Sequence, residues 1–142
     1  MARFRQNKAS SGVFMLEMII VILFFAIASV ICVGLFVEAR LLSSQSALLS
    51  NATNLCRNAA ECVRSVGDDP AALTELLGGA PAGEDYVVCY NSNMEAVAED
   101  APDARYRLVI DFDRQQEMLF ADITLSGQDA PIYTLQTAHY KP

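Results

Sequence analysis

The stretch Gly12-Val13-Phe14-Met15-Leu16-Glu17 opens a long apolar segment, and the 20 residues that follow it, Met18–Val37, contain no charged side chain. A carboxylate is unusual at this place, because a charged side chain costs about 2.5–3.5 kcal/mol at the centre of a bilayer and less near its surface. Cleavage after Gly12 would create an α-amino group on Val13, four residues and one helical turn from Glu17. A carboxylate at this place needs a partner for its charge, and an amine on Val13 could supply one.

The segment Met18–Val37 has the length of a membrane span. As a helix it would extend about 30 Å, which matches the hydrocarbon thickness of a bilayer. Arg3, Arg5 and Lys8 precede it, and the next basic residue is Arg40. Because basic residues favour the cytoplasmic side, we expect a single-pass protein of the cell membrane with a cytoplasmic N-terminus and an exported C-terminal domain.

These residues resemble the class III signal of type IV prepilins and related pseudopilins. That signal has a short basic leader ending in Gly, followed by a Phe-Thr-Leu-Ile-Glu-like opening of a long apolar helix. Here the leader is residues 1–12 and the opening is Val13–Glu17. Val13 replaces the commoner Phe or Met, and Gly34 stands where many Gram-negative pilins carry a helix-bending Pro.

The resemblance implies that the chain has three segments with different roles and a type IV pilin-like fold. Residues 1–12 would be the leader, residues 13–37 the transmembrane and filament-core helix, and residues 38–142 an exported α+β domain. A prepilin peptidase of the membrane would cut between Gly12 and Val13, and the new amine of Val13 would be methylated.

The resemblance also implies partners and a function. The chain would contact membrane lipid before assembly, and copies of itself or other pilins afterwards. Glu17 would neutralise the terminal amine of a neighbouring subunit. The chain would then be a structural subunit, major or minor, of a type IV pilus or of a type II secretion-like or competence pseudopilus on the cell surface.

Other N-terminal signals fit the residues less well. A secretory signal peptide could be cut after Ala26-Ile27-Ala28, but Glu17 would interrupt its apolar region. A lipoprotein signal would use Cys32, but Ile31 precedes it where a small residue is expected. An uncleaved anchor that carries an exported binding domain explains the span but leaves Gly12 and Glu17 without a role, and it is the main alternative.

The exported part begins with a helical pattern and continues as strands. From Arg40 to Val66 the apolar side chains gather on one helical face, and Gly67 with Pro70 ends the helix. One helix is therefore expected from near Phe14 to Val66. Further segments are a short helix, Ala71–Leu77, and strands at Tyr86–Tyr90, Arg105–Asp113, Met118–Leu125 and Ile132–Thr137. Together they predict an α+β fold with an antiparallel sheet of about four strands, covered on one face by the helix.

The charge of the exported part limits its partners. From Glu38 onward the chain has 16 acidic and 7 basic residues, which gives a net charge of −9. Because an acidic surface repels phosphate backbones, we expect no direct nucleic-acid binding.

The cysteines allow one disulfide. Cys32 lies in the apolar run and is expected to pack as a small apolar side chain. Cys56 and Cys62 are six residues apart on one helix and cannot bridge each other there. A bridge from Cys62 or Cys56 to Cys89 is possible, and the alternative is that all three are buried thiols.

No pattern in the chain predicts catalysis, a cofactor or a metal site. His139 has no clear nucleophilic partner in sequence, and with a single His there is no zinc pattern. Glu95, Glu99, Asp100 and Asp103 share one loop, but their spacing does not match an EF-hand. A solvated acidic loop is the favoured interpretation of these residues, with a calcium site as the alternative.

Overall fold

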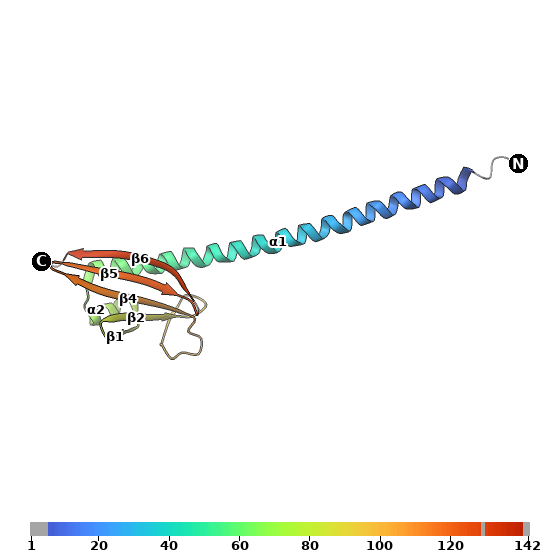
Figure 1. Cartoon of the computed structure of the whole chain (residues 1–142). Helices are drawn as coiled ribbons and strands as arrows, with labels where there is room; N and C mark the ends of the chain where they lie inside the picture. The colour runs from blue at the N-terminus through green and yellow to red at the C-terminus, as the bar shows by residue number, and fades with distance from the viewer. Residues whose placement is uncertain (1–5, 129, 141–142) are drawn as a thin grey trace. The chain divides into compact units, whose positions relative to one another are not determined.

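The structure, a computed structural model, describes residues 6–128 and 130–140, with side chains from residue 11 onward. The chain forms two compact units, Met1–Gln45 and Ser46–Pro142. Helix α1 (Gln6–Val66) contributes to both, because the division falls within it. Figure 1 labels α1, the shorter helix α2 and the strands β1, β2, β4, β5 and β6.

The first unit consists of the N-terminal part of α1. Its apolar side chains from Val13 to Val37 are exposed nearly throughout. Phe24 and Phe25 meet edge to face with 6.3 Å between ring centroids. The Arg40 guanidinium lies over the Phe36 ring, 5.5 Å from its centroid. This part of the helix therefore presents apolar surface on all sides.

The second unit contains an antiparallel sheet. Its strand order is β1-β2-β4-β5-β6, and β3 pairs with β2 beside this path. The strands are β1 (Ala80–Ala82), β2 (Asp85–Tyr90), β3 (Ala96–Val97), β4 (Tyr106–Gln115), β5 (Met118–Ser126) and β6 (Pro131–Tyr140).

The α+β class is confirmed, but the prediction of about four strands is wrong. The four expected strands are β2, β4, β5 and β6, and they form the predicted antiparallel meander. Strands β1 and β3 have three and two residues, so neither is long enough to show an alternating pattern. Both are defined by pairing with the edge of β2.

The core of the second unit lies between one face of the sheet and the C-terminal part of α1. The helix contributes small side chains that are fully buried, including Ala52, Cys56 and Ala59. Strand β5 shows why the sheet has an inner face, because its buried and accessible residues alternate along nearly its whole length. The buried sheet residues packed against the helix include Val88, Leu108, Ile110, Ile123 and Leu125.

The predicted apolar face of the helix is buried only in part. Leu41, Leu42 and Leu49 belong to this face by period, yet they are 60%, 67% and 49% exposed. Burial begins at Ala52, where the sheet becomes available to cover the helix.

The predicted end of α1 is confirmed. Gly67 has φ 69°, and its N–H donates to the carbonyl oxygen of Val63 at 2.8 Å, which is the left-handed helix ending that Gly favours. Asp69 then caps α2 (Pro70–Leu77) by accepting a hydrogen bond from the Ala71 amide at 3.1 Å. Pro70 occupies the first turn of α2, where its missing N–H is not needed.

Candidate functional site

The predicted processing and assembly residues lie in the apolar part of α1. Val13 is 66% exposed, and Glu17 is exposed one turn further on. A Cβ atom added at Gly12 would meet nothing within 4 Å. Leader residues Arg3 and Arg5 lie outside the described residues, as do the others of 1–5. The roles of Gly12, Val13 and Glu17 in cleavage, methylation and assembly stay predictions.

The apolar helix has the length and composition of a membrane anchor. Among the described residues it is the one helix that qualifies, over Ser11–Val66, with a mean hydropathy of 3.1 in the qualifying window. None of that window is buried, whereas the apolar helix of a soluble core would be mostly covered. A cleaved signal sequence would show the same composition, so the helix supports membrane association without defining the topology.

The disulfide that the sequence allowed is not formed. All four cysteines, each within the described part of the chain, are free. Cys56 is packed in the core between helix and sheet, and so are Val88 and Tyr90 of β2. Because side chains alternate along a strand, Cys89 points to the opposite face of the sheet from these two neighbours. A bridge from the helix to Cys89 would have to pass through the sheet.

Burial raises the pKa of the three thiols of the second unit. Loss of solvent around the thiol raises the pKa of Cys56 to about 11, against a weaker opposing effect of a hydrogen bond with the Leu125 backbone. Burial also raises the pKa of Cys62 and of Cys89, with smaller contributions from the charges of Glu61 and Glu99 respectively. Because the thiolate is the reactive form, these cysteines suit packing better than catalysis.

A row of carboxylates crosses the outer face of the sheet. Asp111 of β4 is directly opposite Asp122 of β5, and on its other side it lies beside Asp85 of β2. The charge of Asp85 is the largest cause of a raised pKa of Asp111, followed by desolvation and by the charge of Asp122. Like charges directly across a sheet destabilise it, so the row costs stability.

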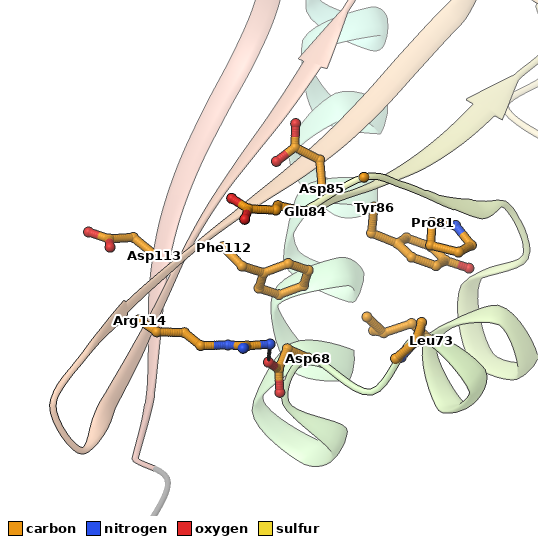
Figure 2. A pocket seen from close by; sticks show the side chains of 11 residues that line it. Asp68, Leu73, Pro81, Glu84, Asp85, Tyr86, Phe112, Asp113 and Arg114 are labelled. Carbon is orange, nitrogen blue, oxygen red and sulfur yellow. Dashed lines mark hydrogen bonds and ion pairs between the residues drawn. The ribbon is translucent and has the colours of Figure 1, made fainter.

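Figure 2 shows a cleft of the second unit, bordered by the turn between α1 and α2, the turn between β1 and β2, and strand β4. Its volume is about 490 Å³. Arg114 reaches from β4 to Asp68 and forms an ion pair with it, with 73% of the Arg114 side chain exposed and only 9% of that of Asp68. The phenyl ring of Phe112 lies between Arg114 and Tyr86 in this view.

Acidic side chains outnumber basic ones in the lining of this cleft. Leu73 and Tyr86 supply buried apolar surface. The Tyr86 hydroxyl donates to the carbonyl oxygen of Gly78 at 3.1 Å and lies 3.0 Å from Thr74 Oγ1, so its ring is held in place. Four carboxylates line the cleft against the single guanidinium of Arg114; they belong to Asp68, Glu84, Asp85 and Asp113.

The acidic loop after β2 has internal partners. Glu99 forms an ion pair with Arg107 at 3.1 Å. Glu95 Oε2 accepts a hydrogen bond from Asn91 Nδ2 at 3.0 Å, while Asn91 Oδ1 accepts from the backbone amides of Asn93 and Glu95. Within residues 6–128 and 130–140, no group of three or more His, Cys, Asp or Glu side chains is placed to hold a metal ion.

Comparison of the chain with protein-family models, with curated proteins and with solved structures gave no match.

Proposed function

We propose that this protein is a prepilin-like structural subunit, which polymerises through its N-terminal helix after its leader is removed. The filament would be a type IV pilus or a type II secretion-like or competence pseudopilus. The observation that carries the proposal is Gly12 followed by Val13 and Glu17 at the start of a 20-residue uncharged run. Each element of that pattern has a separate physical role in assembly.

The form of α1 supports this proposal. The same helix has an exposed apolar first part and a second part that packs on a sheet. An exposed helix that is apolar on all sides needs lipid or other helices around it. A subunit that leaves the membrane to enter a filament would exchange one of these surroundings for the other.

Glu17 provides a specific interaction between subunits, for which a helix that only stays in lipid has no need. Cleavage after Gly12 would leave an ammonium group on Val13, and burying an isolated charge is costly. Opposite charges in a helical bundle reduce that cost when they pair. Pairing between the Val13 amine of one subunit and Glu17 of the next would thus favour the assembled state over the separate subunits.

Mass spectrometry of the mature chain tests the proposal. We expect an N-terminus at Val13, carrying one added methyl group, with the apolar run retained. Gly12→Ala should still be cut in part because Ala is nearly as small, whereas Gly12→Lys should block cleavage. Gly34→Ala, which also removes a helical Gly, serves as the matched control and should be cut normally. A mature chain that begins at Ser29 or Cys32 would contradict the proposal.

A second candidate is a single-span anchored domain that binds a ligand outside the cell. The cleft beside Phe112 and Arg114 favours it, because its volume of about 490 Å³ could hold a small ligand or a side chain of a partner. In this case the chain would keep its leader, so the same mass measurement would find residues 1–12 still attached.

A further inference from the structure

The peptide bond between Gly12 and Val13 lies inside helix α1 rather than in a loop. The structure describes α1 from Gln6 onward, which is six residues before Gly12. In an α-helix the carbonyl oxygen of each residue accepts a hydrogen bond from the amide four residues further on. The helix therefore pairs the carbonyl oxygen of Gly12 with the amide of Leu16, and the amide of Val13 with the carbonyl oxygen of Ala9.

Hydrolysis of this bond needs the Gly12 carbonyl group in different surroundings. The reaction consumes one water molecule, whose oxygen enters the new carboxylate of Gly12, while the nitrogen of Val13 leaves as an ammonium group. A peptidase stabilises the charge that develops on the carbonyl oxygen with hydrogen-bond donors of its own. The carbonyl oxygen must first give up its helical partner, the Leu16 amide. The turn of α1 around the bond must therefore unwind before it is cut.

The residues at the bond are weak helix formers. Ser10, Ser11 and Gly12 follow one another, and Val13 comes next. Serine competes for backbone hydrogen bonds through its hydroxyl group, glycine loses the most backbone freedom in a helix, and β-branched valine loses side-chain freedom. A Cβ atom at Gly12 would meet nothing within 4 Å. Close packing within the chain therefore does not explain the glycine, whereas a helix that opens easily does.

The two sides of the bond differ in how easily they unwind. In the proposed topology the uncharged run Met18–Val37 lies in lipid, where backbone groups released from a helix find no water to bond with. The leader, residues 1–12, lies in water, where isolated helices shorter than about 12–15 residues are marginal. Unwinding is thus easier from the leader side, and the weak helix formers Ser10–Val13 lie at the end of the leader.

We propose that Ser10 and Ser11 raise the rate of leader removal by making α1 easier to unwind at the bond between Gly12 and Val13. They are positioning residues, which act through the backbone conformation rather than through contacts of their hydroxyl groups with the peptidase. This inference rests on the proposed function, which supplies the cleavage step. The peptidase acts on the fraction of chains in which the turn is open, so that fraction scales the rate when the enzyme is limiting.

Two double substitutions shift this fraction in opposite directions. Ser10→Ala with Ser11→Ala strengthens the helix and should slow cleavage about fivefold, which equals about 1 kcal/mol at about 1.36 kcal/mol per factor of ten. Ser10→Gly with Ser11→Gly weakens the helix and should speed cleavage about threefold. The measurement is the half-time of leader loss after pulse-labelling of the full chain, in cells that contain a limiting amount of prepilin peptidase.

The chain offers a matched control in the same helix. Ser43 and Ser44 form a second adjacent pair, exposed and well beyond the apolar run. Ser43→Ala with Ser44→Ala makes the same change in helix propensity away from the bond, and should leave the half-time of leader loss unchanged. If it slows cleavage as much as the alanine pair at Ser10 and Ser11 does, local unwinding is not the cause and the inference is wrong.

Hydrogen exchange of the uncleaved full chain in detergent micelles gives a readout that does not involve the peptidase. The Leu16 amide reports on the open turn, because in the helix it bonds to the Gly12 carbonyl oxygen. It should exchange more slowly in the alanine pair than in the unsubstituted chain, and faster in the glycine pair. Equal exchange in the three chains would show that Ser10 and Ser11 do not control the opening.

The cleavage rates also separate this inference from the proposed function. Slower cleavage of both the alanine and the glycine pair would indicate recognition of the serine hydroxyl groups. Equal rates in all three chains would show that unwinding does not limit cleavage. Either result overturns the inference and leaves the proposed function in place. A leader that stays on every chain, the unsubstituted one included, would refute the proposed function and this inference with it.

Discussion

Gly79 is the residue whose backbone tolerates substitution least. Its φ is 100°, and a Cβ atom built there would collide with the carbonyl oxygen of Val87 and lie 2.9 Å from Val88 Cγ2. The left-handed conformation alone costs a residue other than Gly about 1–2 kcal/mol. Gly79→Ala should therefore lower the free energy of unfolding by more than about 2 kcal/mol, measured by urea denaturation.

Gly83 provides the control for this substitution. It also has positive φ, 72°, but a Cβ atom there would meet nothing within 4 Å. Gly83→Ala should cost only the conformational part, about 1–2 kcal/mol. Equal losses for the two variants would show that the collision with Val87 is relieved by a small movement of β1 and β2.

The raised pKa of Asp111 leads to a prediction of how the stability of the fold depends on pH. Its pKa is raised, chiefly by the charge of Asp85 and then by desolvation and Asp122, so the folded state holds this proton more tightly than the unfolded state. Stability should fall as pH rises from the ordinary pKa of Asp, about 3.9, through the raised value in the folded state. Asp111→Asn should flatten this fall and raise the urea midpoint at pH 7.

Added salt and a second variant distinguish the local repulsion at Asp111 from the general effect of removing one negative charge. Asp111 is exposed, so added salt should screen the repulsion and reduce the difference between Asp111→Asn and the unsubstituted chain. Asp103→Asn makes the same charge change in the loop before β4, outside the row. An equal gain from Asp103→Asn would show that the row of aspartates has no special effect.

Some residue roles follow from local sequence and others do not. Gly67 and Pro70 could be assigned to the end of α1 because helix termination depends on neighbouring residues. The side of the sheet to which Cys89 points depends on which face of β2 is turned to the core. The sequence alone does not determine that face, because Tyr86–Tyr90 is apolar on both faces. The collision at Gly79 depends on a pairing between strands and has no local signal.

At the scale of elements, the contact of α1 with the sheet depends on small side chains. Ala59 is fully buried in this interface. Ala59→Leu adds volume where the helix lies close to the sheet, and should lower the free energy of unfolding by about 1–3 kcal/mol. Asn58→Leu is the control, because Asn58 is exposed on the same turn. A thermal melt should show a clear loss for the first variant and little change for the second.

The longer helices and strands could be predicted from the sequence, and the shortest strands could not. The helix ending at Val66 and the four longer strands carry many residues of one period, so their patterns are clear. Strands β1 and β3 exist only because β2 offers them a partner. Likewise, Leu41 and Leu42 have the period of a buried face but remain exposed, since period alone does not say where the covering sheet begins.

At the scale of the whole molecule, the two units differ in whether their apolar side chains are buried within the chain. The buried residues in the described part of the chain all lie between Ala52 and Thr137, so the second unit contains its own core. The apolar helix of the first unit has no such cover. The sequence predicted this difference between the two units. A helix that is apolar on all sides and a helix with one apolar face have different residue patterns in each helical turn. Assembly should therefore depend on the first unit and folding on the second.

Glu17→Ala tests this separation. Removing a charge from the apolar helix should ease membrane insertion, so the unassembled protein should accumulate normally. Incorporation into filaments should fall severalfold, because the Val13 ammonium would be buried without its counter-charge at a cost of several kcal/mol. Glu38→Ala, which removes the acid just beyond the uncharged run, should assemble as the unsubstituted chain does. Both are measured as the sheared filament fraction of cells that also express unsubstituted chains. Equal recruitment of Glu17→Ala would refute its role in pairing subunits.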